Sequence, residues 1–251
     1  MKIVADIHTH TIASGHAYST VKENIDHALS VGLEYLGISD HTPGMPNTTS
    51  EGHFYNLRVL HDTVGGLRVL KGAEANIVDS KGRIDLPGDV VSILDYVIAS
   101  LHDLVIENMG ITANTQAVIQ AMKHPCVRVI GHPDDSRYPL DYKALTMAAK
   151  ATNVALELNN SSLSSNSSRI GAWDNARRML EQCKLTRTSI IVGSDSHIWY
   201  DVGEFSSALS LLKQCNFPPE LVINSNKESF ERFMNLTGNT ANLADAAIAI
   251  A

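Results

Sequence analysis

The sequence predicts an α/β fold, a distorted seven-stranded (β/α)7 barrel similar to a TIM barrel. Short runs of apolar and β-branched residues alternate with segments whose apolar residues recur three and four positions apart. This alternation is typical of βαβ units that build a parallel sheet. Seven such units follow one another without an internal repeat or an obvious linker. Because parallel strands are joined by right-handed crossovers, seven units favour a closed or nearly closed barrel over an open sheet.

Each element follows from its local pattern. The predicted strands, in chain order, are 2–7, 35–40, 68–76, 95–101, 127–131, 154–159 and 188–195. The predicted helices are 20–31, 53–64, 113–123, 141–151, 171–183 and 204–214, with a closing helix at 226–236. Gly82, Pro87 and Gly88 interrupt this rhythm, which predicts an irregular insertion over 76–94.

Composition narrows the class of protein. The 251 residues are 44% apolar and 19% charged, the balance of a globular enzyme or binding protein. We expect one domain over residues 1–236 and a C-terminal tail over 237–251. No apolar run is long enough to span a membrane, and the N-terminus shows no secretory signal. Three separated cysteines without CxxC spacing indicate reduced thiols and a cytoplasmic location.

The charge balance bears on possible partners. The formal net charge is −7, and no basic cluster exceeds the pair Arg177–Arg178. Binding to the backbone of a long nucleic acid needs many phosphate-neutralising cations. Long nucleic acid is therefore not an expected partner, whereas a nucleotide-sized substrate is not excluded.

Residues of the metal-ligating type follow six of the seven predicted strands. They are, in chain order, His8 and His10, His41, Glu74, His102, His132, and finally Asp195 with His197. The sixth strand ends instead in Asn159 and Asn160. In β/α barrels the carboxyl ends of the strands form the active-site face, so we expect these side chains to converge. Metal coordination explains such a convergence better than other arrangements do.

Local spacing supports the same interpretation. In the segment HTH, His8 and His10 are two positions apart and point the same way in an extended chain. The segment DSH repeats this arrangement with Asp195 and His197. One HxH segment is a weak signal, but both segments together with four more strand-end residues strongly indicate a metal site. The alternative is a set of barrel-mouth residues that only hydrogen-bond to the backbone.

The number of candidate ligands indicates several ions. With His16, in the loop after the first strand, the candidates number nine. One zinc ion takes roughly three or four protein ligands, so nine suggest three ions, with Glu74 bridging two of them. Clustered divalent ions are typical of phosphoryl transfer, where they clamp phosphoryl oxygens, generate hydroxide near neutral pH and stabilise the leaving oxygen.

Four further charged residues have candidate roles. Asp6 and Asp40 precede ligand positions and could orient imidazoles from behind, although a plain strand-end cap explains each equally well. Arg169, in the loop after the sixth strand, is a candidate phosphate contact because the guanidinium fork matches phosphate. Arg137 is a second candidate, but arginines in exposed loops are more often solvated.

Other polar residues have less specific explanations. The residues that end the sixth strand either meet substrate or form a turn: Asn159, Asn160, Ser161 and Ser162. The remaining histidines are assigned surface or capping positions and no role: His27, His53, His61 and His124.

An ordered set of motifs runs from residue 4 to residue 197. The motifs are DIHTHTIASGHAYST, ISDHTPGMP, KGAEANI, ASLHD, IGHPDD, LELNNSS and GSDSH. This set resembles the PHP family (polymerase and histidinol phosphatase), most closely its small bacterial phosphatases of the YcdX type. The segment GEF at 203–205 and the closing helix extend the resemblance to about residue 236. The resemblance is specific because the whole ordered set recurs.

The resemblance implies a trinuclear metal centre in a deep cleft of the barrel. The implied ligand sets are His8, His10, Glu74 and Asp195 for one ion, Glu74, His102 and His132 for a second, and His16, His41 and His197 for the third. All nine positions carry the residue types that the family has there. Zinc is the first choice of metal, with manganese and iron as alternatives, because mixed imidazole–carboxylate sites suit all three.

The predicted function is that of a metal-dependent phosphatase, a hydrolase acting on phosphoric ester bonds. Within that class we expect a phosphomonoesterase for a small phosphorylated metabolite. A hydroxide activated by the trinuclear centre would attack phosphorus in line, with Arg169 stabilising charge on the phosphoryl oxygens. The expected partner is this small substrate. We expect no membrane association, and a homo-oligomer is compatible with the sequence.

Three other functions remain open at this point. One is a phosphodiesterase or 3′–5′ exonuclease, since PHP domains attached to polymerases are linked to that chemistry. Another is a two-metal amidohydrolase, in which a modified lysine, here Lys71, would bridge the ions. The last is a metal-binding PHP protein without catalysis. The sequence does not indicate the physiological substrate or the general acid.

Overall fold

Seven parallel strands form a nearly closed barrel, as predicted. The computed structural model describes residues 1–236, and the predicted tail at 237–251 lies outside this range. The parallel strands are β1 (Ala5–Asp6), β2 (Tyr35–Ile38), β4 (Leu67–Asn76), β5 (Tyr96–Ser100), β6 (Val127–Ile130), β7 (Ala155–Asn159) and β8 (Ile190–Gly193), neighbours in that order. The (β/α)7 fold class is therefore confirmed.

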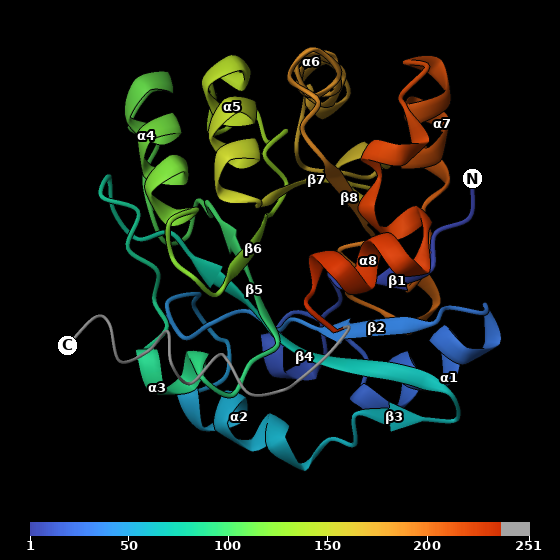
Figure 1. Ribbon diagram of the computed structural model, residues 1–251. Coiled ribbons are helices and arrows are strands. Elements are labelled where there is room, and N and C mark those ends of the chain that lie inside the picture. Colours follow the sequence, from blue (N-terminus) through green and yellow to red (C-terminus); the bar gives the residue numbers. More distant parts are fainter. Residues whose placement is uncertain (237–251) are drawn as a thin grey trace.

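Helices cover the outside of the barrel, and α4, α5, α6 and α7 stand in a row beside the strands (Figure 1). The α-helices are α1 (Val21–Ser30), α2 (Glu51–Asn56), α3 (Gly88–Val91), α4 (Ile111–Ala121), α5 (Tyr142–Thr152), α6 (Ala172–Thr186), α7 (Ser206–Gln214) and α8 (Lys227–Phe233). The helix α1 begins with a capping box, in which Thr20 and Glu23 satisfy each other's backbone N–H groups.

The barrel closes between β1 and β8. Near the carboxyl ends of these strands, the His10 backbone N–H donates to the Ser196 carbonyl at 2.8 Å. Further back, the side chain of Asn224 fills the seam between the two strands. Its Nδ2 donates to the carbonyls of Ala5 and Val192 at 2.8 and 2.7 Å, and its Oδ1 accepts from the Val192 N–H. One amide side chain thus satisfies backbone groups that would otherwise lack a ladder partner.

A buried tyrosine fills the barrel interior. The Tyr96 hydroxyl donates to the Ile7 carbonyl at 2.6 Å, which joins β5 to the end of β1. A Cβ atom at Gly37 or Gly72 would lie 2.0 or 2.3 Å from the Tyr96 side chain, so both strands need glycine there. Phe230 of α8 packs in the same interior cluster.

The predicted helix at 53–64 is wrong in its second half. The helix α2 ends at Asn56, a 3-10 turn covers Leu57–Val59, and Thr63–Val64 form the short strand β3, antiparallel to β4. Gly65 and Gly66 both have positive φ angles (59° and 92°), which makes the two-residue loop of a β-hairpin. The pair of glycines after two β-branched residues was the sequence signal for this hairpin.

The segment 76–94 is irregular, as predicted. It also positions a residue at the carboxyl end of β4. It folds back through an Ile77–Ile84 bridge before the short helix α3. Asp85 in this segment accepts hydrogen bonds from the Asn76 backbone N–H at 2.8 Å and from the Asn76 side chain at 2.7 Å. The insertion thereby fixes the orientation of Asn76.

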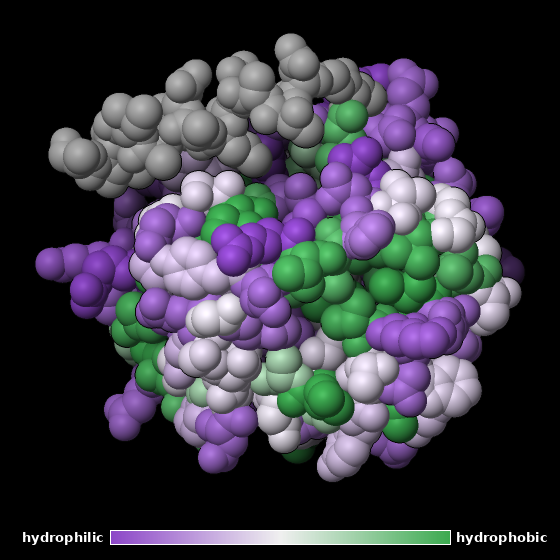
Figure 2. All heavy atoms as spheres, turned by 90° about the horizontal axis from the view of Figure 1, so that it is seen from below, coloured by the Kyte–Doolittle hydropathy of each residue, from purple (hydrophilic) through white to green (hydrophobic). Residues whose placement is uncertain are grey.

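An apolar patch lies on the face that carries α1, α2 and β3, seen from below in Figure 2. Exposed apolar residues on these elements and the turns beside them are Leu29, Val31, Val59 and Val64. An exposed apolar patch of this kind is typical of a surface that binds another protein chain. That the protein forms a homo-oligomer stays a prediction. In residues 1–236, no helix has the length and apolar content that crossing a bilayer requires.

Candidate metal centre

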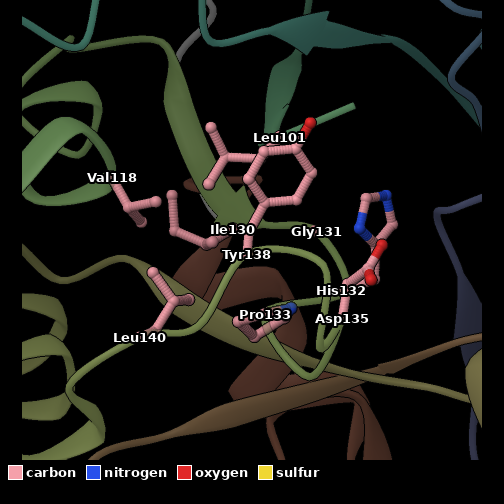
Figure 3. Close-up of a pocket in the computed structure, with 9 residues that line it drawn as sticks. All are labelled: Leu101, Val118, Ile130, Gly131, His132, Pro133, Asp135, Tyr138 and Leu140. Atoms are coloured by element: carbon pink, nitrogen blue, oxygen red, sulfur yellow. The ribbon is translucent and has the colours of Figure 1, made fainter. Parts of the chain in front are cut away.

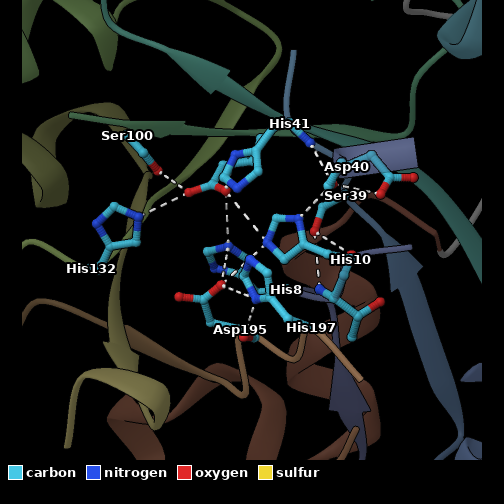
Figure 4. Close-up of polar contacts among 12 residues, drawn as sticks. His8, His10, Ser39, Asp40, His41, Ser100, His132, Asp195 and His197 are labelled. Atoms are coloured by element: carbon cyan, nitrogen blue, oxygen red, sulfur yellow. Dashed lines mark hydrogen bonds and ion pairs between the residues drawn. The ribbon is translucent and has the colours of Figure 1, made fainter. Parts of the chain in front are cut away.

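Glu74, near the carboxyl end of β4, is the meeting point of five imidazoles. Figure 4 shows four of these rings, His8, His10, His41 and His132, turned toward one another. The Glu74 Oε2 atom lies 2.9 Å from His41 Nδ1, 3.4 Å from His8 Nε2 and 3.5 Å from His10 Nε2. The Oε1 atom lies 2.9 Å from His132 Nε2 and 3.2 Å from His102 Nε2. The Ser100 hydroxyl also donates to Oε1 at 2.7 Å. The carboxylate comes from β4, and the five rings come from the ends of four other strands, β1 (His8 and His10), β2, β5 and β6, as the barrel topology predicts.

Asp195, after β8, joins the remaining candidates to this group. Its Oδ1 lies 3.4 Å from His8 Nε2 and 3.2 Å from His10 Nε2. The His197 ring lies 4.3 Å from the His10 ring and 4.8 Å from the His16 ring, between centroids. The His16 ring in turn lies 4.9 Å from the His41 ring. The structure therefore brings all nine predicted residues together.

Several atoms at the heart of this cluster are buried and, although close to one another, make no hydrogen bond of acceptable geometry in the described part of the chain. They are His8 Nε2, His10 Nε2, His41 Nδ1 and Glu74 Oε2. A buried polar atom without a partner is costly, and four that face one another call for a shared cation. Imidazole nitrogen and carboxylate oxygen are the ligands of zinc, manganese and iron sites, so the residues present fit such ions.

Three imidazole rings of the cluster have a hydrogen-bond partner on the ring nitrogen that faces away from its centre. His8 Nδ1 lies 2.7 Å from Glu157 Oε1, His10 Nδ1 lies 3.1 Å from the Ser14 hydroxyl, and His102 Nδ1 lies 2.6 Å from Asn76 Oδ1. A metal-binding histidine usually has its second nitrogen fixed in this way, because the partner sets both the tautomer and the ring orientation.

Asp40 acts on His10 through Ser14. The Ser14 hydroxyl and the Thr11 N–H both donate to Asp40 Oδ1 at 2.7 Å, and His53 Nε2 lies 3.0 Å from Oδ2. Burial alone would raise the pKa of Asp40, but the hydrogen bonds and the nearby imidazoles bring this pKa down to about 2. His53, to which the sequence assigned no role, thus contacts the support of His10, and no local motif signalled this.

Asp6 has a different role from Asp40. It accepts from the backbone N–H groups of Gly203 at 2.8 Å, Ser194 at 3.2 Å and His8 at 3.4 Å, and within residues 1–236 it makes no hydrogen bond to an imidazole. Burial raises the pKa of Asp6 to about 6, against the lowering effect of these hydrogen bonds. Asp6 therefore ties β1 to the segments around β8, which matches the strand-end cap interpretation.

Glu157 is the main residue that the sequence reasoning missed. It lies on β7, is 1% exposed and contacts both His8 and the backbone of His132. The available signal was a charged residue in the middle of the apolar run VALELN, since an acid in a buried strand needs a partner. Glu157 was missed because only the residues at the strand ends were considered as candidates.

Arg169 reaches the inner cluster, whereas Arg137 does not. Arg169 Nη1 donates to Asp195 Oδ2 at 2.9 Å and to the Ser162 hydroxyl at 3.1 Å. Burial alone would raise the pKa of Asp195, but His8 and Arg169 hold it well below its usual range. The Arg137 guanidinium instead pairs with Asp135 at 2.7 Å and with the exposed Asp103.

Two residues of the cluster have left-handed backbone conformations. His132 has a φ of 29° and follows Gly131, the residue after β6. Asp195 has a φ of 54° and lies two residues after Gly193, the last residue of β8. Such conformations cost free energy for a residue with a side chain and persist where surrounding contacts impose them. Here they turn both side chains toward Glu74 and His8.

The electrostatics suit metal uptake. Burial and the neighbouring His197 and His41 hold the pKa of His10 well below its usual range, so its ring is neutral. Burial would lower the pKa of His8 too, but the carboxylates of Glu157, Asp195 and Glu74 raise it well above the usual value. A cation bound by His8 would therefore displace a proton.

Behind His132 lies a cavity of about 10 Å³ lined mainly by apolar residues (Figure 3). Its lining includes Leu101, Val118, Ile130 and Leu140. A space of this size holds about one water, so it is packing space and no substrate cleft. The cluster reaches solvent at His16, which is exposed, and at His197, whose side chain is 31% exposed.

Comparison with known proteins gives sequence relatives and structural neighbours, while no family model matches the chain. A probable phosphatase of Clostridium novyi is 40% identical over 243 residues, which cover 97% of this chain and 99% of that protein. Another probable phosphatase, from Acetivibrio thermocellus, is 43% identical over 234 residues, 93% of this chain and 96% of that protein.

A solved structure shares the fold at low sequence identity. The histidinol phosphate phosphatase of Lactococcus lactis, complexed with zinc, L-histidinol and phosphate, aligns with a TM-score of 0.60 at 17% identity. The alignment covers 87% of this chain and 95% of that chain.

Proposed function

Since the chain belongs to the family of these bacterial probable phosphatases, we propose that it is a metal-dependent phosphomonoesterase acting on a small phosphorylated metabolite. Within the PHP family it would be a small phosphatase of the YcdX type. The observation that carries the proposal is the set of four buried, unpartnered ligand atoms around Glu74 and Asp195. A cation there would satisfy all of them, and multivalent cations are the usual means of phosphoester hydrolysis.

The proposed centre contains three ions, with zinc as the first choice and manganese or iron as alternatives. The proposed ligand sets are His8, His10, Glu74 and Asp195 for the first ion, Glu74, His102 and His132 for the second, and His16, His41 and His197 for the third. Three groups of candidates have ligand atoms within 4.8 Å of one another. The group His8, His10 and Glu74 falls within the first set, whereas the groups His10, His41, His197 and His41, Glu74, His102 each join residues of two sets. The division into sets therefore rests on the resemblance to the PHP family.

When bound, the ions would supply Lewis acidity that activates water and neutralises charge on the phosphoryl oxygens. The protein's own residues do the rest. Arg169 would bind a phosphoryl oxygen through the N–H groups that do not face Asp195, close to the reacting phosphorus. Ser14, Asn76 and Glu157 hold the imidazoles in one orientation, so no reorganisation is needed as charge develops.

The first test is the choice between a phosphate monoester and a diester. Enzyme reconstituted with zinc or manganese is assayed with p-nitrophenyl phosphate beside bis(p-nitrophenyl) phosphate. Preference for the monoester is expected, and it opens a screen of sugar, nucleotide and amino-alcohol phosphates. The amino-alcohol phosphates are included because the Lactococcus lactis neighbour holds L-histidinol and phosphate. Preference for the diester would replace the proposal with the nuclease function, and no activity on either substrate would return the amidohydrolase and the non-catalytic functions.

The second test concerns the ligands. His10→Ala and Asp195→Ala should each abolish turnover and lower the metal content while circular dichroism shows an intact fold. Full activity of either variant in metal-replete enzyme would contradict the assignment. Lys71→Met is the matched control, because Lys71 Nζ pairs with Asp62 at 2.8 Å. This variant should keep full activity, whereas an amidohydrolase with a bridging modified lysine would lose it.

A further inference from the structure

The strand β7, which carries no ligand candidate at its end, carries a buried carboxylate in its middle. Glu157 of β7 faces three N–H donors: His8 Nδ1 lies 2.7 Å from Oε1, and the His132 backbone N–H and the Asn159 side-chain amide donate to Oε2 at 2.8 and 3.0 Å. His8 and His132 belong to different ions in the proposed centre. The Glu157 carboxylate therefore contacts one proposed ligand residue of each of two ions.

The chemistry of these partners leaves Glu157 one role. A backbone N–H and an amide NH₂ only donate, so Oε2 must accept both of their hydrogen bonds. With Glu157 as a carboxylate, Oε1 is also an acceptor, and His8 then carries a proton on Nδ1. The Nε2 atom of His8, 3.4 Å from both Glu74 Oε2 and Asp195 Oδ1, is then the atom free to bind a metal.

The surroundings of Glu157 are closely fitted to it. A Cβ atom on Gly193 of β8 would lie 2.0 Å from Glu157 Oε1 and 3.1 Å from His8 Cβ, so only glycine leaves room for this contact. The bond from the His132 N–H holds that residue at its φ of 29°. Asn159, bonded to Oε2, also donates to Asp195 Oδ2 at 3.1 Å. Support from β7 thus extends to a third ligand candidate.

We propose that Glu157 is a positioning residue that fixes His8 and His132 together, so that the first and second ions are bound as a coupled pair. The inference rests on the proposed function for the identity of the ions. It goes beyond that function by assigning β7 the task of holding ligands that come from β1, β6 and β8.

The test is Glu157→Gln, which keeps the shape but replaces one acceptor with a donor. Because two donors face the Oε2 position, the amide oxygen must sit there and the NH₂ must face His8 Nδ1. His8 can then accept on Nδ1 only by carrying its proton on Nε2, the metal-binding atom. We expect Glu157→Gln to retain at least one ion fewer per chain than wild type after dialysis against the same free zinc concentration, measured by mass spectrometry of the metals.

A second readout follows His8 directly. In proton–nitrogen NMR of histidine-labelled protein, wild type should show a hydrogen-bonded Nδ1–H on His8, assigned by its absence in His8→Gln. This signal should be lost in Glu157→Gln. Asp95→Asn is the matched control, because Asp95 is a partly buried carboxylate that accepts the Lys71 N–H at 2.7 Å, away from the cluster. It should keep the wild-type metal content and the His8 signal.

The outcomes separate this inference from the proposed function. Wild-type metal content and an unchanged His8 signal in Glu157→Gln would overturn the positioning role. If the variant does not fold, the absence of an Nδ1–H on His8 in wild type would overturn it instead. If wild type itself takes up no metal, the proposed function fails, while the His8 signal in the metal-free chain still tests the contact with Glu157.

Discussion

The nine ligand candidates form an inner group and an outer pair that differ in burial and in support. The inner group is at most 7% exposed and consists of His8, His10, His41, Glu74, His102, His132 and Asp195. The outer pair is His16, which is exposed, and His197, whose side chain is 31% exposed. The inner group surrounds one carboxylate, whereas His16 meets its neighbours mainly through ring contacts.

This difference separates two tasks that one metal centre must combine. A buried, prepositioned set of ligands binds its ions tightly and excludes water from the unpartnered atoms. An exposed pair leaves an open side through which a substrate can approach. We therefore expect ions of the inner group to be structural as well as functional, and an ion of the outer pair to exchange most readily with solution.

Removing the shared carboxylate should have the largest effect. Glu74→Gln deprives five imidazoles of their common anion, and we expect turnover of p-nitrophenyl phosphate to fall by at least about 10³-fold. Metal content should fall with it, by more than one ion per chain. A variant that keeps its metals and loses activity would show that Glu74 acts on the reaction rather than on the ions.

Arg169 lies at the boundary between the inner group and solvent, so its loss should affect substrate more than metal. We expect Arg169→Ala to lower kcat/KM by about 10²-fold, because a charge-assisted contact to phosphate is lost, at unchanged metal content. Arg137→Ala is the comparison, since Arg137 pairs with the exposed Asp103 and with Asp135, a carboxylate that also lies 3.7 Å from Arg169 Nε. Equal losses in both variants would refute a specific phosphate contact at Arg169.

The outer pair should respond to the metal supply. We expect His16→Asn to lower turnover by about 10-fold at limiting zinc or manganese and to recover when the metal concentration is raised. His8→Asn, which removes an inner ligand, should not recover under the same titration. A His16 variant that stays inactive at every metal concentration would mean that the outer pair is as essential as the inner group.

The comparison also shows what the sequence could and could not reveal. Ligand candidates at strand ends are predictable because the barrel topology brings consecutive carboxyl ends to one face. The phosphatase family indicated by the motifs is confirmed by the relatives, while the narrower YcdX type stays a prediction. The prediction of seven parallel strands is confirmed. It was possible because each strand corresponds to a local apolar run.

Supporting residues were harder to predict because they depend on contacts between distant segments. Glu157 meets His8 across 149 positions of the chain, and Asn224 closes the seam between β1 and β8 without any local motif. His53 meets Asp40 only because the segment after β2 folds back over it. No periodicity carries such information. The exception was the hairpin at β3, where Gly65 and Gly66 offered a signal that the helical pattern obscured.

The smallest effects should come from the two aspartates behind the inner group, and they should differ in sign with pH. In the metal-free chain, Asp40 has a pKa of about 2, so between pH 4 and 2 only the unfolded chain takes up its proton. The stability that Asp40 contributes is therefore present above about pH 4 and lost as the pH falls. Its size is about 2 kcal/mol. The disadvantage of Asp40→Asn against wild type should shrink over this range in urea unfolding.

Asp6 should behave in the opposite way, because burial raises its pKa to about 6. Between about pH 4 and pH 6 the folded chain keeps a proton that the unfolded chain has released, so the free energy of unfolding falls as the pH rises. The total is on the order of 3 kcal/mol. Asp6→Asn, which cannot ionise, should gain on wild type by up to this amount between pH 4 and 6 in the same experiment. Parallel pH profiles for the two variants would contradict the distinction between Asp40, whose pKa is lowered by hydrogen bonds and imidazoles, and Asp6, whose pKa is raised by burial in spite of hydrogen bonds from Ser194 and the backbone.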